Sequence, residues 1–272
     1  MHGNLHKMRT HLENAQAHYT LVLSEQQLAL NELLGHRLTL NYQGTINCVH
    51  CGKKTSKSFN QGYCYPCFTR LAQCDMCIMK PETCHYAAGT CREPQWGEEF
   101  CFQPHYVYLA NSSGLKVGIT RQNQLTTRWI DQGAVMALPI FKVASRYIAG
   151  LIEVCFAQHV SDKTSWQKML KSHAEPIDLA AERDALVARC QTELNALSQR
   201  FGAEAIDYLA SAESVTINYP IHTYPSKVTS FNLDKQAVVS GVLQGIKGQY
   251  LLFDTGVINI RKFSGYAVSL ES

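Results

Sequence analysis

The sequence predicts an α+β protein with a cysteine-rich module, a small α/β core around a central antiparallel sheet, and a β-rich terminal domain. Nine of its eleven cysteines fall between Cys48 and Cys101. The middle of the chain alternates between strand and helix patterns, and residues 215–272 return to short strands separated by glycines. Hydrophobic residues make up 46% of the 272 positions, which is enough to form more than one core.

We expect five segments along the chain. Their boundaries are 1–45 for an N-terminal β segment, 46–105 for the cysteine-rich module, 106–175 for the α/β core, 176–214 for an acidic helical connector, and 215–272 for a C-terminal β domain. The net charge is +4 over 106–175 and −4 over 176–214, although the whole chain carries only +3. The core is therefore the basic part of a chain whose overall electrostatic field is weak.

The sequence excludes several classes of protein. No run approaches the 18 apolar residues that a membrane helix needs, and residues 1–10 lack the apolar region of a signal peptide. We therefore expect a cytoplasmic protein with no membrane partner. Because disulfides are rare in that compartment, the clustered cysteines indicate metal binding.

The N-terminal segment begins with β structure. Residues 18–23 and 37–42 alternate like half-buried strands, with a short helical pattern around Leu28, Leu30 and Leu33 between them. At the other end, residues 238–243, 250–253 and 257–260 have strand patterns. Residues 38–48 and 250–260 share four identities in eleven positions, which suggests that both ends contribute similar hairpins to one β domain.

The core pattern is a hairpin followed by helices. The expected elements are strands at 106–110, 115–120 and 138–143, a helix through Arg128 and Trp129, an apolar helix at 146–160, and an acidic helix at 178–201. A turn of sequence Asn-Ser-Ser-Gly joins the first two strands.

The first four cysteines form two CxxC pairs, Cys48 with Cys51 and Cys64 with Cys67, separated by twelve residues. Each pair can place two thiolates about 2.3 Å from one tetrahedral zinc ion. An iron-sulfur cluster uses the same ligands and stays a rival interpretation.

A second set of thiols follows, with His85 and His105 nearby. Its members are Cys74, Cys77, Cys84, Cys91 and Cys101. Cys74 and Cys77 form the best local pair, but Cys77, Cys84, Cys91 and Cys101 are also a plausible quartet, and the spacing leaves both open. We expect two structural zinc ions per chain in total.

The loop between the first two cysteine pairs carries Lys53, Lys54 and Lys57 but no acidic residue, together with two aromatic residues. Such a loop can offer ammonium groups to phosphates and rings to bases, or it can be an ordinary solvated loop. A further basic face could run along Lys142, Arg146, Lys163, Lys168 and Lys171.

The central unit resembles the GIY-YIG nuclease superfamily. The resemblance rests on Tyr106-Val-Tyr108, on Lys116-Val-Gly-Ile-Thr120 ten residues after it, on Arg128, and on Glu153 in a later helix. It implies that Arg128 contacts the scissile phosphate and that Glu153 binds a catalytic Mg²⁺ or Mn²⁺. This chain has Lys116 where the second motif usually has its tyrosine. Nearly the whole chain is also similar to a bacterial family of proteins of unknown function.

The residues themselves permit this chemistry. A phosphodiester hydrolase needs a carboxylate-held divalent ion, a cation for developing charge and a base for water. Glu153, Arg128 and Tyr108 could fill these roles, and Lys116 and Arg121 could add phosphate contacts. We expect a nucleic acid, RNA or DNA, as partner. The alternatives are a non-catalytic RNA- or DNA-binding adaptor and a zinc-stabilised scaffold for protein interactions.

Overall fold

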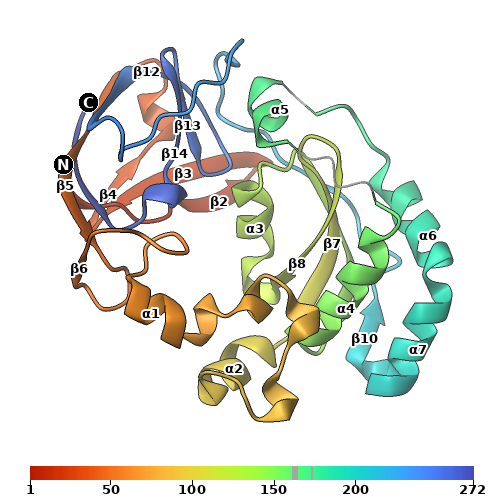
Figure 1. Cartoon of the computed structure of the whole chain (residues 1–272). Helices are drawn as coiled ribbons and strands as arrows, with labels where there is room; N and C mark the ends of the chain where they lie inside the picture. The colour runs from red at the N-terminus through yellow and green to blue at the C-terminus, as the bar shows by residue number, and fades with distance from the viewer. Residues whose placement is uncertain (161–164, 173) are drawn as a thin grey trace.

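The computed structural model describes residues 1–160, 165–172 and 174–272. It is a mixed α/β structure in which a β domain formed by both ends of the chain stands beside an α/β core (Figure 1). The cysteine-rich module lies along one side of both parts. None of the helices within the described ranges is long and apolar enough to cross a membrane.

The largest sheet of the described residues joins the two ends of the chain. Its path is β1 (His2–Asn4), β15 (Tyr266–Glu271), β5 (Arg37–Asn47), β12 (Val238–Lys247), β13 (Tyr250–Phe253) and β14 (Gly256–Asn259), with β6 (Lys54–Thr55) paired to β5. Leu40 is opposite Val239 on one side and Leu270 on the other. Both ends therefore contribute to one sheet, but not as similar hairpins, because residues 38–48 fall on and just after the single strand β5 whereas residues 250–260 form the β13–β14 hairpin.

A smaller sheet covers this domain. It consists of β2 (Arg9–Glu13), β3 (Gln16–Leu23) and β4 (Gln26–Ala29), followed by the 3-10 turn η1 (Asn31–Leu33). The predicted helix around Leu28 and Leu33 is therefore wrong. Leu28 pairs with Leu21 across the β3–β4 hairpin, and Leu30 is buried. The two-residue spacing of Leu28 and Leu30 fits a strand, and only the last turn is helical.

The α/β core matches the predicted hairpin and strands. Its sheet runs β10 (Ile206–Tyr208), β9 (Met136–Val143), β7 (His105–Asn111) and β8 (Leu115–Arg121), with β11 (Val215–Thr216) also paired to β9. In this hairpin Tyr108 lies opposite Gly118. Strand β8 is an edge strand of this sheet and contacts both α3 and α4, so Lys116 and Gly118 lie on the strand next to these helices.

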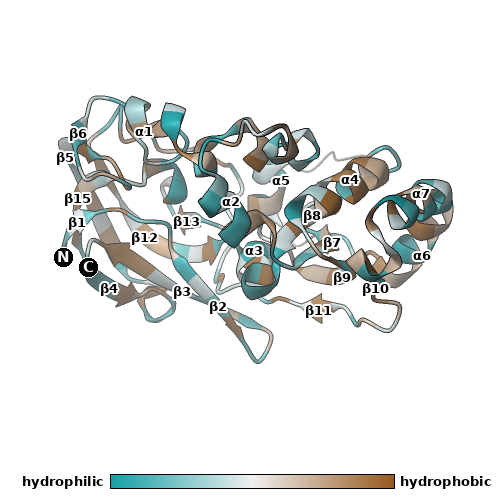
Figure 2. Cartoon of the chain, turned by 90° about the horizontal axis from the view of Figure 1, so that it is seen from below, coloured by the Kyte–Doolittle hydropathy of each residue, from teal (hydrophilic) through white to brown (hydrophobic). Residues whose placement is uncertain are grey.

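Helices α3 (Leu125–Asp131), α4 (Arg146–Ala157), α6 (Leu179–Arg189) and α7 (Gln191–Phe201) flank the core sheet. Helix α5 (Trp166–Lys171) instead packs on β13 and β14 of the β domain. The largely hydrophobic α4 (Figure 2) buries Ile148, Ile152 and Phe156 against the strands. The predicted acidic helix is two helices that meet at Cys190, whose backbone leaves helical geometry.

The cysteine-rich module contains short elements only. They are α1 (Tyr65–Arg70), α2 (Pro94–Cys101), and the 3-10 turns η2 (Ala72–Cys74), η3 (Met76–Ile78), η4 (Pro81–Thr83) and η5 (Tyr86–Ala88). Among residues 76–104 only Pro81 and Gly97 are buried. This segment therefore has almost no hydrophobic core of its own.

Helix α3 connects the β domain to the core. Trp129 and Ile130 belong to the same buried cluster as the β-domain residue Leu21. The buried Asp131 carboxylate pairs with Lys7 and accepts a hydrogen bond from Gln249 at 2.8 Å. These contacts fix α3, and so fix the direction in which Arg128 leaves it.

Candidate metal centre and cationic pocket

The two CxxC pairs converge on one point. The four sulfur atoms of Cys48, Cys51, Cys64 and Cys67 all lie within 4.8 Å of one another. The Sγ atoms of Cys51 and Cys64 are 3.8 Å apart, which is about the separation that two ligands have in a tetrahedral site with 2.3 Å bonds. The chain thus forms a cluster of four cysteines that could hold a structural zinc ion, as the sequence predicted.

The local backbone explains how these thiols meet. Cys48 and Cys51 flank the turn after β5, where Gly52 has a left-handed φ of 71°. Cys64 is the N-cap of α1, so Cys67 lies on its first turn. Glycine is favoured at this turn because other side chains adopt positive φ only at a cost.

The thiols of this cluster differ in acidity. Burial raises the pKa of the Cys48 thiol, but backbone hydrogen bonds from Cys51, Cys64 and His50 outweigh burial and lower that pKa to about 6. Burial and hydrogen bonds with the other thiols raise the pKa of Cys67 to about 12. Thiolates this close repel one another, so all four can ionise together only when a cation is present.

The later thiols separate into two environments. Cys74 is buried in the same small cluster as Cys48, Cys64 and Cys67, outside the group of four sulfur atoms. Cys77, Cys84, Cys91 and Cys101 instead line one cavity of about 20 Å³ beside α2. The sequence left these two groupings open, and in the structure Cys74 does not line that cavity.

Acidic and imidazole groups lie near Cys77 as well. One ligand atom each from Asp75, Cys77 and His85 lies within 4.8 Å of the others. The Asp75 carboxylate is already paired with Arg92 at 2.7 Å, and the His85 ring bonds Thr90 at 2.8 Å. These polar groups therefore have partners within the protein.

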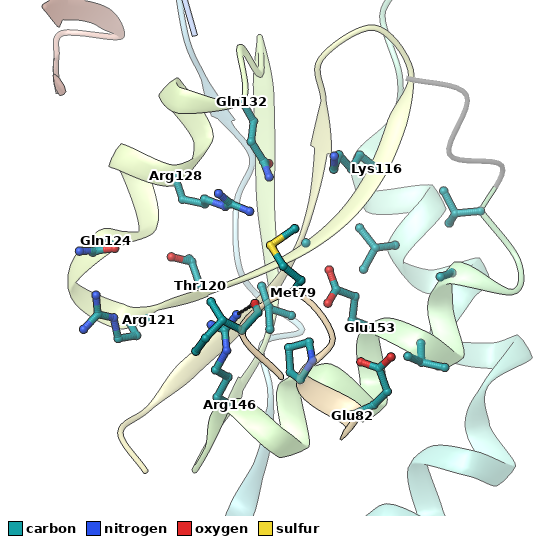
Figure 3. A pocket seen from close by; sticks show the side chains of 18 of the residues that line it. Met79, Glu82, Lys116, Thr120, Arg121, Gln124, Arg128, Gln132, Arg146 and Glu153 are labelled. Atoms are coloured by element: carbon teal, nitrogen blue, oxygen red, sulfur yellow. Dashed lines mark hydrogen bonds between the residues drawn. The ribbon is translucent and has the colours of Figure 1, made fainter. Parts of the chain in front are cut away.

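A cationic pocket of about 560 Å³ opens where the cysteine-rich module meets the core (Figure 3). Its charged and amide side chains are Glu82, Lys116, Arg121, Gln124, Arg128, Gln132, Arg146, Glu153 and Arg261. Arg128 and Glu153 point into it from opposite sides, with Glu82 on the side of Glu153. Strand β8, helices α3 and α4, the turn η4 and the β domain each contribute to its wall.

Burial changes the acidity of the groups in this pocket. It lowers the pKa of Arg146, whose Nη2 donates to the Ile78 carbonyl at 2.5 Å. It also lowers the pKa of Arg121 and Arg261. Burial raises the pKa of Glu153, while the positive charges of Arg146 and Arg128 oppose that rise. An anion that enters the pocket would therefore stabilise the charged form of each partly buried cation.

Tyr108 lies beneath the pocket and does not line it. Its ring is fully buried, and a Cβ atom on Gly118 would come within 2.6 Å of its Cζ and Oη atoms. The Gln132 amide links it to the pocket, because its nitrogen can donate to the Tyr108 hydroxyl over 2.8 Å while its oxygen faces the Arg128 guanidinium at 3.3 Å. Burial raises the pKa of Tyr108 to about 12.

The pocket brings together Lys116, Arg121, Arg128 and Glu153, all four of which the sequence singled out. It does not include the predicted phosphate contacts in the first cysteine loop. These residues are Lys53, Lys54 and Lys57, which are exposed on that loop. Lys163 of the proposed basic face lies outside the described residues.

Three charged pocket residues are not among the predicted site residues. The sequence indicates Arg146 only as a member of a basic face, and it gives Arg261 no place in the resemblance to a nuclease. Glu82 has no recognisable motif, because it follows a proline in a short turn. All three come from segments distant in sequence, so only the fold brings them to the pocket.

The described residues thus form a mixed α/β structure with two candidate sites, a cluster of four cysteines that could hold a metal ion and an arginine-rich pocket. The chain belongs to a family described as Protein of unknown function (DUF2797), whose model matches residues 35–268. No curated protein matches the chain significantly. No solved structure matches it significantly either.

Proposed function

We propose that the pocket binds phosphate groups of a nucleic acid. The observation that carries this proposal is the convergence of five cationic side chains on one pocket with only two carboxylates, Glu82 and Glu153. Within the described residues, no ion pair of 4.0 Å or less neutralises Arg128, Arg146 or Lys116. Guanidinium groups bind phosphate oxygens in pairs, so this arrangement suits a phosphodiester backbone.

The same pocket supports a more specific proposal, metal-dependent phosphodiester cleavage. Glu153 is the carboxylate that would hold a Mg²⁺ or Mn²⁺ ion, and such an ion would supply polarisation of a phosphoryl oxygen. Arg128 lies across the pocket and would stabilise negative charge developing on the phosphate. Lys116 would orient the phosphate from strand β8. These roles follow the resemblance to the GIY-YIG nucleases.

A second candidate function is a non-catalytic RNA- or DNA-binding adaptor. Two observations favour it: Lys116 replaces a phenol, and Tyr108 is buried with its pKa raised to about 12. Tyr108 therefore keeps its proton at neutral pH and has no direct path to a water molecule in the pocket. In this case the arginines hold phosphates without cleaving the backbone.

We also propose that the chain carries two structural zinc ions. Cys48, Cys51, Cys64 and Cys67 would hold the first, and the later thiols would supply the second. Neither site would leave a coordination position open for chemistry.

Binding and cleavage can be tested with matched variants. Fluorescence anisotropy with labelled single- and double-stranded oligonucleotides should show weaker binding for Lys116→Ala and Arg128→Ala. The controls Lys227→Ala and Arg37→Ala remove the same charges from exposed positions outside the pocket and should bind like the wild type. Equal affinity in all four variants would place nucleic-acid binding elsewhere or exclude it.

The Glu153→Gln variant distinguishes the nuclease hypothesis from the adaptor hypothesis. In a nuclease this variant retains binding but loses cleavage that depends on Mg²⁺ or Mn²⁺, because the amide cannot hold the ion. Glu213→Gln, at an exposed position outside the pocket, is the control. Absence of cleavage of any RNA or DNA by the wild type, with only a lower melting temperature for Glu153→Gln, would favour the adaptor.

A further inference from the structure

The segment from Met76 to Pro104 needs a cross-link that hydrophobic packing does not provide. It buries only two residues, yet it keeps a defined path through three 3-10 turns and α2. Four thiols from different points of this path line one cavity, although their sulfur atoms are less tightly gathered than those of the first cluster: Cys77 in η3, Cys84 after η4, Cys91 before α2, and Cys101 at its end. In small segments without a core, a bound metal commonly supplies the missing stability.

The cavity suits one ion. Its volume of about 20 Å³ exceeds the roughly 10–15 Å³ that a single water-sized sphere occupies. Cys77, Cys84, Cys91 and Cys101 all line this cavity, so an ion placed in it would have four thiols as neighbours.

The neighbouring polar groups are poorer candidates. Asp75 is held by Arg92 and also accepts from the backbone N–H of Cys77 as the N-cap of η3. Cys74 lies with the first cluster instead. The His85 ring bonds the Thr90 hydroxyl through Nδ1 at 2.8 Å and faces the Asp75 carboxylate through Nε2 at 3.5 Å. Four thiols therefore remain as the ligand set, and zinc is the ion that four thiolates bind without redox chemistry.

We propose that Cys77, Cys84, Cys91 and Cys101 form a second zinc site, and that this site holds one wall of the cationic pocket in place. The wall is the loop between the first two of these ligands. Ile78, Met79, Pro81 and Glu82 all line the pocket.

Two contacts connect this loop to α4. The Arg146 guanidinium donates to the Ile78 carbonyl, and Pro81 packs directly over Gly150. With zinc bound, the loop is fixed at both ends by Cys77 and Cys84. Without zinc, the loop would keep these two contacts with α4 but lose the cross-link at both ends, so we expect it to open more readily. The effect on phosphate binding rests on the proposed function, whereas the metal assignment does not.

Metal analysis of single variants tests the ligand set. Protein purified without added metal should contain two zinc ions per chain, and Cys84→Ser and Cys91→Ser should each contain one. Cys74→Ser is the matched control and should retain two. Two zinc ions in the Cys84→Ser or Cys91→Ser variant, loss of one in Cys74→Ser, or iron in place of zinc would overturn the assignment.

X-ray absorption spectroscopy at the zinc edge gives a second test, which uses the wild-type protein and so does not depend on whether a variant folds. The wild type should show only sulfur ligands, at about 2.3 Å. Nitrogen or oxygen ligands would instead indicate His85 or Asp75 and contradict the four-thiolate site.

Hydrogen exchange tests the connection to the pocket. Peptides covering residues 77–84 should exchange faster in Cys84→Ser than in the wild type, and at the wild-type rate in Cys74→Ser. Equal protection in Cys84→Ser would refute the role of zinc in holding the wall. If oligonucleotides fail to bind even the wild type while this pattern of metal loss and exchange is observed, the proposed function fails and the zinc site stands.

Discussion

The close packing of the cysteine-rich module on α4 makes a quantitative prediction at Gly150. Glycine to alanine in a helix normally stabilises a protein, by about 1 kcal/mol at most. Here the added Cβ atom would lie 2.5 Å from the Cβ of Pro81 and 2.9 Å from the backbone nitrogen of Glu82. Ordinary contacts begin near 3.4 Å, so the η4 turn would have to move by nearly an ångström.

Overpacking of this kind costs about 1–3 kcal/mol. We therefore expect Gly150→Ala to lose about 1 kcal/mol after the helix gain of up to about 1 kcal/mol is subtracted. Gly97→Ala is the matched control, because it also lies in a helix but its Cβ would meet its nearest neighbour at an ordinary 3.5 Å. We expect the control to be neutral or to gain up to about 1 kcal/mol.

Thermal unfolding of the two variants with metal bound measures this difference. A change of about 1 kcal/mol shifts the melting temperature by roughly 2–4 °C in proteins of about this size. Gly150→Ala should therefore melt several degrees below Gly97→Ala. If Gly150→Ala melts at or above the wild type, the module does not pack on α4 as described.

Three further predictions concern acidity, capping and metal. Burial lowers the pKa of His105 from 6.5 to about 4. The free energy of unfolding should therefore be unaffected by this group above pH 6.5. It should fall between pH 6.5 and about pH 4, because in that range the histidine is protonated in the unfolded chain but not in the folded one. His105→Gln should remove up to about 3 kcal/mol of that pH dependence in urea unfolding curves. Asp178 accepts hydrogen bonds from two backbone N–H groups at the start of α6, so Asp178→Ala should lower stability by about 1 kcal/mol while Glu213→Ala changes little. Cys51→Ser should release one zinc ion in elemental analysis, and retention of both would refute the first site.

Sequence patterns predicted the α/β core well because its strands and helices are local and strongly periodic. The β7–β8 hairpin and α4 lie close to their expected positions. The N-terminal helix prediction failed because Leu28, Leu30 and Leu33 fit both the two-residue repeat of a strand and the 3.6-residue repeat of a helix. Leu28 lies in a strand because it pairs with Leu21 across a hairpin. The local sequence pattern does not reveal this partner.

The candidate site was predictable only in part. Lys116, Arg128 and Glu153 stand in an ordered series on neighbouring elements, so their convergence could be expected. Glu82 and Arg261 reach the pocket because the cysteine-rich module packs on α4 and the C-terminal segment returns to the β domain. Contacts between such distant segments depend on tertiary packing, and a single sequence carries no periodic signal for them.

The salt dependence of nucleic-acid binding tests the central claim most directly. Each cation that contacts a DNA phosphate contributes about 0.9 to the slope of log affinity against log salt concentration. We predict that Arg128→Ala lowers both the affinity and the steepness of this slope, by about 0.9 for duplex DNA, while Arg37→Ala leaves both unchanged. Identical slopes and affinities for the wild type and Arg128→Ala would contradict a phosphate-binding pocket at this site.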